Sequence, residues 1–248
     1  MKKQKELIEE TYQDKDIVKV FDKERNRYSY QRYKHKVESK FLKDTLKKFK
    51  KPIRVLDVAC GTGRMLPEVF SVNRDIFYTG FDSSMNMVYS LLEKAGYLNK
   101  PVRIKIGDAM NIPYPDNSFD VVYTYHLLWH LPQEEQEKVI KEMLRVCKPN
   151  GYIHIDFLNK NFIFEKFKHL FKKPTEGIYK FSLKEIESII QTKDYKIKKL
   201  CDFPVKNTLL YKCLNILNLF RFMLPLNFYH MCFLRIKKGG DTRCFKSS

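Results

Sequence analysis

The pattern of apolar and polar positions between residues 53 and 157 alternates between two periods. Five short runs have the length and the β-branched or aromatic content of buried strands: 53–58, 76–81, 102–107, 119–125 and 151–157. Between them, "SSMNMVYSLLEKAG" predicts a helix from Ser83 with Gly96 near its end, and "PQEEQEKVIKEMLRVCKPNG" predicts a helix closed by Pro149-Asn150-Gly151. Strands that alternate with helices in this way indicate βαβ units and a mainly parallel sheet.

Two further segments flank this region. Before residue 50 the chain is charged and rich in tyrosine, and the portion from about Tyr33 predicts one helix that leads into the first strand. After residue 160, "FSLKEIESIIQ" carries a helix capping box, with Ser182 as the N-cap and Glu185 three residues later. The pattern also predicts two last strands and, between them, a helical stretch: 195–203, 229–238 and about 206–224. We expect one domain with an accessory segment at each end.

Net charge points to a class of partner rather than to a function. The 248 residues include 47 lysines and arginines against 29 acidic residues, which gives a formal net charge of +18. Such a charge favours nucleic acid or an anionic membrane surface as a partner. The chain is also rich in Asn, Ile, Tyr and Phe, so codons rich in adenine and thymine are an alternative source of the lysines.

The cysteines and the apolar stretches bear on the compartment. The six cysteines are scattered without a Cys-x-x-Cys pair, so we expect no metal and no disulfide framework, and we expect Cys60 and Cys147 to be buried thiols. The first residues lack the apolar region of a signal peptide. Residues 209–234 are interrupted by Lys212, Arg221 and Pro225 and make a poor membrane span. These features predict a cytoplasmic protein.

The glycine turn in "LDVACGTGRM" indicates a ligand other than a dinucleotide. Asp57 ends the first strand, and Gly61 and Gly63 follow it, which lets the backbone turn with positive φ and approach a ligand closely. A dinucleotide turn would carry a third glycine, but Leu66 occupies that position. A carboxylate at the mouth of the turn repels phosphate and attracts a cation. We therefore expect a nucleoside-like ligand with positive charge, and a dehydrogenase is the weakest alternative.

Two more acids follow at the ends of the next two strands. Asp82 lies 21 residues after Gly61, a spacing that suits an acid that binds ribose hydroxyls. Asp108 ends the third strand, where it could accept a hydrogen bond from an adenine amino group. An aspartate at a strand end is often only a turn or cap residue, but three of them on successive strands predict one pocket.

Residues 53–157 resemble the S-adenosylmethionine-dependent class I methyltransferases, in particular the methyltransferase-11-type group. The resemblance rests on four ordered motifs, "VLDVACGTGRM", "GFDSSMNMV", "GDAMNIPYPDNSFDVVYTYHLLWHL" and "EMLRVCKPNGYIHI". It implies a Rossmann-like α/β fold with a seven-stranded, mostly parallel sheet, helices on both faces and an antiparallel last strand. It also implies a helical N-terminal lid over residues 1–50, a cofactor-binding core over 51–160 and a C-terminal part, 161–248, with a helical insertion.

The resemblance implies S-adenosyl-L-methionine as the cofactor and gives each motif residue a role. Asp57, Gly61 and Gly63 would hold the methionyl end, and Asp82 would bind the ribose hydroxyls. The remaining cofactor-binding residues would be Ala59, Ser83, Met85 or a residue near it beside the base, Asp108 and Ala109 at the adenine edge, and Tyr125 beside the methionyl group. Ala59 is a departure, because a glycine is more usual there; alanine is small enough that we expect little consequence.

The acceptor is less well determined than the cofactor. Methyl transfer needs a general base only if the acceptor oxygen or nitrogen must lose a proton, and His130 and His126 are the candidates; a structural role in the following loop is the alternative. No Asn-Pro-Pro-Tyr-type run follows the fourth strand, which favours a small-molecule acceptor with an apolar or lipid-like body. The alternatives are an RNA (tRNA) base methyltransferase, suggested by the charge, and a non-catalytic cofactor-binding or partner-regulating protein.

Overall fold

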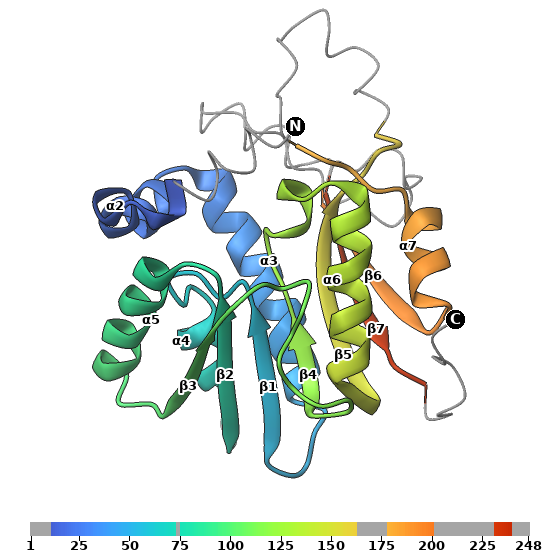
Figure 1. Ribbon diagram of the computed structural model, residues 1–248, viewed down its shortest axis with the longest axis horizontal. Helices are drawn as coiled ribbons and strands as arrows, with labels where there is room; N and C mark the ends of the chain where they lie inside the picture. Colours follow the sequence, from blue (N-terminus) through green and yellow to red (C-terminus); the bar gives the residue numbers. More distant parts are fainter. Residues whose placement is uncertain (1–10, 73–74, 163–177, 201–230, 240–248) are drawn as a thin grey trace, which may run out of the picture.

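Seven strands form one mixed sheet in the computed structural model, which describes residues 11–72, 75–162, 178–200 and 231–239 (Figure 1). The strands are β1 (Ile53–Val58), β2 (Ile76–Asp82), β3 (Val102–Ile106), β4 (Phe119–Tyr123), β5 (Cys147–Leu158), β6 (Tyr195–Leu200) and β7 (Met231–Lys237), and their order is β3-β2-β1-β4-β5-β7-β6. β1 to β5 pair in parallel, whereas β7 is antiparallel to both β5 and β6. The Rossmann-like fold with an antiparallel last strand is confirmed.

Helices cover both faces of this sheet. They are α2 (Lys15–Asn26), α3 (Ser29–Leu46), α4 (Leu66–Phe70), α5 (Met85–Tyr97), α6 (Gln133–Val146) and α7 (Leu183–Ile190), with a 3-10 turn at Leu128–His130. Leu42, Leu66 and Leu91 bury α3, α4 and α5 against one face, while Met143 and Ile186 bury α6 and α7 against the other. Strands β2 and β3 lie on one side of β1, and β4 and β5 lie on the other, so the strand order reverses between β1 and β4. Open α/β sheets bind their ligands at such a switch point.

The start of the chain and the helix after β2 differ in detail from the prediction. α3 begins at Ser29 rather than near Tyr33, and a second helix, α2, precedes it. α5 begins at Met85, because Ser84 and not Ser83 is the N-cap and accepts a hydrogen bond from the backbone N–H of Met87. The capping box of Ser182 and Glu185 is confirmed at the start of α7.

The predicted end of the long helix before the fifth strand was wrong. α6 ends at Val146, and Cys147 already pairs with Phe119 of β4. Asn150 has a φ of 62°, and a Cβ on Gly151 would lie 2.8 Å from the carbonyl oxygen of Asp120. Pairing with β4 and β7 therefore draws the Pro-Asn-Gly sequence into an irregular strand instead of a turn, and tertiary pairing overrides the local stop signal.

The other predicted elements agree within a few residues or fall outside the described residues. β3 and β4 end one and two residues earlier than predicted, and β6 and β7 lie within the predicted ranges. Cys60 and Cys147 are buried free thiols, as predicted. Residues 206–224, the predicted helical insertion, lie outside the described residues. Within the described part of the chain, each helix is too short or too polar to cross a bilayer.

Candidate functional site

A cavity of about 390 Å³ opens where β1 to β4 end and α2 lies across them. Most of the residues selected from the sequence line it, namely Asp57, Ala59, Gly61, Asp82, Ser83, Asp108, Ala109, Tyr125, His126 and His130. The N-terminal segment contributes Tyr12, Gln13, Phe21 and Arg25 to the opposite wall. Gly63 and Met85 are not part of this lining. The parallel strands therefore bring residues that are far apart in the sequence to a single cavity.

The glycine turn leaves the floor of the cavity open. Ala59, Gly61 and Gly63 have φ values of 58°, 53° and 69°, a region that side chains other than glycine rarely adopt. A Cβ on Gly61 would meet nothing within 4 Å, whereas one on Gly63 would lie 2.7 Å from Cγ of Leu91. Gly61 thus presents bare backbone to a ligand, and Gly63 lets the turn pack closely on α5. Ala59 adopts a conformation that its Cβ strains.

Asp57 is a buried carboxyl group at the end of β1. The hydroxyls of Tyr78 and Tyr123 both donate hydrogen bonds to its Oδ2, at 2.8 and 2.6 Å. Burial nevertheless raises the pKa of Asp57 to about 7, because these two hydrogen bonds offset only part of the lost hydration. A cationic ligand beside this group would favour its ionised form, which gives Asp57 a reason to bind an ammonium group.

Asp82 connects the end of β2 to the glycine turn. Its Oδ2 accepts a hydrogen bond from the backbone N–H of Gly61 at 2.7 Å, and its Oδ1 accepts one from the N–H of Ser84 at 2.8 Å. Burial raises the pKa of Asp82, and these backbone donors oppose the rise. Next to it, Met87 is 3% exposed and lines the cavity, while the side chain of Met85 is 45% exposed. The residue near Met85 that reaches the cavity is Met87.

Asp108 and Tyr125 frame the cavity at its two ends. Asp108 is exposed at the rim, and its Oδ1 accepts a hydrogen bond from the N–H of Met110 at 2.9 Å. Tyr125 is buried, and its hydroxyl lies 3.3 Å from Nδ1 of His154. Since His154 engages that hydroxyl, the rest of the Tyr125 side chain is what can line the cavity.

Residues before β1 cover the cavity from outside. The Oγ of Ser84 donates a hydrogen bond to the carbonyl of Tyr12 at 2.6 Å, and Gln13 Nε2 donates to the carbonyl of Ser83 at 3.3 Å. Asp22 of α2 accepts hydrogen bonds from Thr62 Oγ1 in the glycine turn and from Lys94 of α5, both at 2.7 Å. Hydrogen bonds of Tyr12, Gln13 and Asp22 therefore hold the N-terminal segment against one side of the cavity, and we call this segment the lid.

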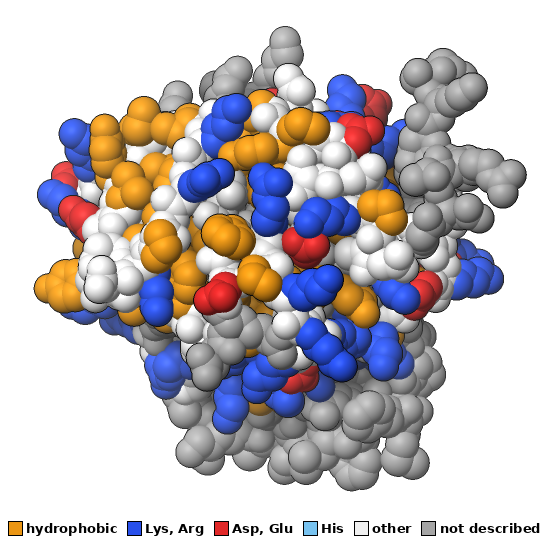
Figure 2. Space-filling model, turned by 90° about the horizontal axis from the view of Figure 1, so that it is seen from below, with side chains coloured by type: hydrophobic (Ala, Val, Ile, Leu, Met, Phe, Trp, Pro, Cys, Tyr) orange, Lys and Arg blue, Asp and Glu red, His pale blue; other side chains and the backbone are white. Residues whose placement is uncertain are grey.

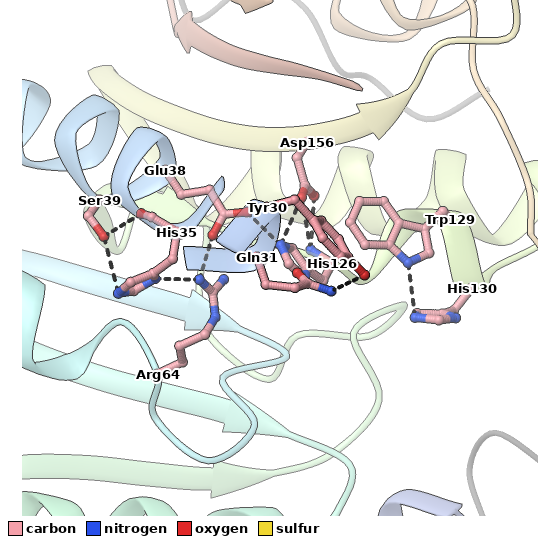
Figure 3. A network of polar contacts seen from close by, with 10 residues as sticks. All are labelled: Tyr30, Gln31, His35, Glu38, Ser39, Arg64, His126, Trp129, His130 and Asp156. Carbon is pink, nitrogen blue, oxygen red and sulfur yellow. Dashed lines mark hydrogen bonds and ion pairs between the residues drawn. The ribbon is translucent and has the colours of Figure 1, made fainter. Parts of the chain in front are cut away.

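His126 lies in a buried network of charged groups beyond β4 (Figure 3). Its Nε2 lies 2.5 Å from Oε1 of Glu38, whose other oxygen is 2.5 Å from Nη1 of Arg64. The backbone N–H of His126 donates to Asp156 at 2.9 Å, and its φ is 70°. Burial alone would raise the pKa of the Glu38 carboxyl. The surrounding cations, of which Arg64 has the largest effect, outweigh burial and hold this pKa below its ordinary value. Burial and then the charge of Glu38 raise the pKa of Asp156, so Glu38 carries the negative charge.

His130 has a different environment from His126. Nε1 of Trp129 donates a hydrogen bond to Nε2 of His130 at 3.0 Å (Figure 3). Burial, followed by the positive charge of Arg25, lowers the pKa of His130 to about 4. The ring is therefore neutral at physiological pH, and its acceptor nitrogen is already occupied. This geometry suits His130 to donate a hydrogen bond from Nδ1 better than to accept a proton.

Several residues of the site were missed by sequence reasoning, and they lie before β1 or in β5: Tyr12, Phe21, Arg25, Glu38 and Asp156. One signal was present. Glu38 shares a helix face with Leu42, Thr45 and Leu46 in α3, all of them buried, so a carboxylate was placed on an apolar face. Since charged residues are rarely fully buried without a partner, that position could have been singled out.

The same network contains the atoms that a metal ion would need. One ligand atom from each of Glu38, His126 and Asp156 lies within 4.8 Å of the others. Arg64 already pairs with Glu38 at 2.5 Å and would compete with a cation there. The absence of a metal remains a prediction from the sequence.

The Rossmann-like sheet and the cavity with acids at three strand ends form the arrangement expected of the class I methyltransferase fold. Comparison with protein families agrees: residues 56–155 match the family described as a methyltransferase domain, the methyltransferase-11 type. This part of the chain is therefore similar to the methyltransferase domains of that family.

Individual relatives are all named as methyltransferases, but their names give different acceptors. The chain is 38% identical over 108 residues to ajmaline N-methyltransferase of Rauvolfia serpentina, covering 43% of this chain and 36% of the relative. It is 34% identical over 156 residues to demethylmenaquinone methyltransferase of Staphylococcus aureus, covering 61% and 60%. The match thus spans between about a third and three fifths of the length of such relatives.

A solved structure of another methyltransferase has a similar fold. Magnesium protoporphyrin IX methyltransferase from Synechocystis, solved with bound SAH, superposes with a TM-score of 0.66 and 17% identity over 95% of this chain and 100% of that one. At this identity the likeness establishes the fold alone.

Proposed function

We propose that this protein is an S-adenosyl-L-methionine-dependent methyltransferase that acts on a small-molecule acceptor with an apolar body. The observation that carries the proposal is the convergence of Asp57, Asp82 and Asp108 on one cavity around a turn with positive φ. Relatives named for an alkaloid and a quinone precursor support a small acceptor, since both names denote small molecules.

The residues present fit this cofactor. Asp57 is buried, and a nearby cation would stabilise its ionised form, so it would bind the methionyl ammonium. The bare backbone at Gly61 would leave room for the rest of the methionyl group. Asp82 would accept hydrogen bonds from the ribose, and Asp108 at the rim would accept one from the adenine amino group. When bound, the cofactor supplies an electrophilic methyl group on a positively charged sulfur.

The protein's own contribution to the chemistry is positioning and, for a protic acceptor, proton removal. The cavity walls would align the acceptor with the methyl group and exclude water, which can supply several kcal/mol of the barrier. His126 is the better-placed base, because its Nε2 faces the Glu38 carboxylate and leaves Nδ1 to accept a proton. Glu38 would stabilise the imidazolium that forms. His130 would serve as a hydrogen-bond donor, and its role as a base is the second possibility.

The one face that Figure 2 shows does not by itself support an RNA acceptor. Figure 2 shows lysine and arginine side chains interspersed with hydrophobic and acidic ones on the face seen from below Figure 1. A nucleic-acid interface would place its cations in one continuous patch or stripe. An RNA or anionic membrane partner remains the alternative that the net charge of +18 suggests.

Two measurements test the proposal. Calorimetric titration should show micromolar binding of S-adenosylmethionine and S-adenosylhomocysteine and no binding of NAD. Incubation with a methyl-labelled donor should then label the small-molecule fraction of an extract. Label in the RNA fraction, with a steep dependence of RNA affinity on salt, would favour the alternative. Cofactor binding without turnover on any fraction would favour a non-catalytic cofactor-binding protein.

A further inference from the structure

Arg25 places a guanidinium cation in the wall of the cavity. It belongs to α2 and lines the cavity, with its guanidinium 5.6 Å from the centre of the Phe21 ring. Among the described residues, no carboxylate lies at ion-pair distance from it. The neighbouring cations are satisfied: Arg64 pairs with Glu38 at 2.5 Å, and Lys94 with Asp22 at 2.7 Å.

The charge of Arg25 persists at physiological pH. Burial and the adjacent Arg64 lower the pKa of Arg25 to about 10, which is still well above neutrality. A partly buried cation without a partner has lost hydration and gained little in return. An anion that entered the cavity would restore that loss, because hydrogen bonds between charged groups are about twice as strong as neutral ones.

His130 adds a donor on the same side of the cavity. The indole N–H of Trp129 can only donate, so Nε2 of His130 accepts and the neutral ring carries its proton on Nδ1. Nδ1 is buried and has no hydrogen-bond partner among the described residues. A buried donor without a partner has lost its hydrogen bonds to water and gained none in return, which is unfavourable. Arg25 lies within electrostatic range of His130, since its charge contributes to lowering the pKa of that ring.

Arg25 and His130 both line the cavity, and the neighbours of Arg25 assign them to the side proposed for the acceptor. Arg25 interacts electrostatically with Glu38 and Asp156, which surround His126 beyond β4 and β5. The acids assigned to the cofactor lie at the ends of β1, β2 and β3 instead. Tyr12 and Phe21, whose ring centres are 5.8 Å apart, provide an apolar surface beside the cation.

We propose that Arg25 and the Nδ1–H of His130 together bind a carboxylate group of the methyl acceptor. The inference rests on the proposed function and narrows its substrate class to small acids with an apolar body. The guanidinium would hold the carboxylate through paired N–H donors, and His130 would donate to one of its oxygens. The apolar body of the acceptor would contact Tyr12 and Phe21. The atom that receives the methyl group would then face Tyr125 and His126.

The test is a calorimetric titration of the protein saturated with S-adenosylhomocysteine. The probes are benzoate, cinnamate and decanoate, each compared with its own primary amide. We expect at least one acid to bind the wild type about tenfold or more tightly than its amide, as a charge-assisted hydrogen bond would give. Arg25→Gln should reduce that ratio to less than about threefold, and Arg25→Lys should keep part of it because the charge remains.

Matched variants separate the site from a general effect of charge. Arg27 follows α2 directly and pairs with the exposed Glu24. The Arg27→Gln variant therefore loses a nearby cation outside the proposed site, and it should retain the wild-type preference for the acid. His130→Gln should weaken acid binding less than Arg25→Gln, because only one neutral donor is changed. The single tryptophan, Trp129, has its ring centre 6.0 Å from that of His130, so its fluorescence reports binding independently.

The outcomes are distinct. An unchanged acid preference in Arg25→Gln, or no preference in the wild type, would overturn the inference. A loss of about tenfold or more in S-adenosylhomocysteine affinity in Arg25→Gln would also overturn it, because Arg25 would then serve the cofactor's own carboxylate. The acids are titrated without S-adenosylhomocysteine as well. Failure of the wild type to bind that ligand would therefore refute the proposed function while the acid preference is still measured.

Discussion

Nε2 of His126 lies 2.5 Å from the carboxylate of Glu38, although 88 residues separate them in the chain. The contact joins α3, which comes before the sheet, to the loop after β4. A carboxylate on one ring nitrogen fixes the tautomer and leaves the other nitrogen to accept a proton. The pair therefore links the N-terminal helices to the chemistry at the strand ends.

Replacement of His126 by asparagine should separate catalysis from folding. Asparagine tolerates the positive φ of 70° at this position better than most residues, so the backbone should keep its conformation. For an acceptor that must lose a proton, we expect turnover to fall by roughly 10²- to 10⁴-fold. Single-turnover transfer of a labelled methyl group measures this loss.

The affinity for S-adenosylhomocysteine is the control for that variant, and it should stay within about threefold of the wild type, since His126 is proposed to act on the acceptor and not to bind the cofactor. Unchanged turnover in a folded His126→Asn variant would exclude the base. Turnover would also be unchanged if the nucleophile of the acceptor carries no proton. In that case the rate of the wild-type protein should not depend on pH between 6 and 9.

Binding of the cofactor should depend on pH through Asp57. Its pKa of about 7 in the free protein lies above its ordinary value of 3.8, so the carboxyl is largely protonated at pH 6 and ionised at pH 8. If the methionyl ammonium binds only the ionised form, affinity should rise about tenfold over this interval. Calorimetry in matched buffers, with S-adenosylmethionine and S-adenosylhomocysteine, measures the slope.

Asp57→Asn is the matched control for this titration. It should bind both ligands weakly and without the pH dependence. A raised pKa also means that ionised Asp57 opposes folding as the pH rises from about 4 through 7, so the variant should melt at pH 8 no lower than the wild type. A wild-type affinity that stays constant from pH 6 to 8 would show that Asp57 does not face the ammonium.

The motif acids could be found from the sequence because strand periodicity fixes where each strand ends. Asp57, Asp82 and Asp108 follow apolar runs of strand length, and parallel strands bring their ends to one edge. Ala59, Gly61 and Ser83 lie in the same turns, and the structure places all of them at the cavity. Met85 shows the limit of this reasoning, because a shift of one residue in the start of α5 turns its side chain outward.

The other wall of the cavity could not be found in the same way. α2 has charged residues on most of its surface, and its pattern does not say which face meets the cavity. Arg25 looks like a solvated side chain in the sequence, and only the packing of α2 against α3 and α5 brings it to the cavity wall. Likewise, Asp156 in β5 faces His126 because β5 pairs with β4, a contact that depends on the order of strands.

Asp82→Ala should weaken cofactor binding by about 1–3 kcal/mol, which is roughly 5- to 150-fold in affinity. Part of the loss comes from the ribose contacts and part from the backbone N–H groups of Gly61 and Ser84, which Asp82 now satisfies. Asp82→Asn keeps one acceptor oxygen and should lose less. Equal affinity of a folded Asp82→Ala protein and the wild type would remove the ribose assignment.

The lid should release ligand faster when its contact with the glycine turn is cut. Asp22 joins α2 to Thr62 and Lys94, and its partly exposed ion pair with Lys94 is worth roughly 0.5–1 kcal/mol. Asp22→Ala should therefore raise the dissociation rate of S-adenosylhomocysteine about 2- to 5-fold and increase amide exchange in α2. Asp16→Ala, which removes an exposed pair with Lys19 on the same helix, should change neither. Equal dissociation rates for the two variants would mean that α2 does not control access to the cavity.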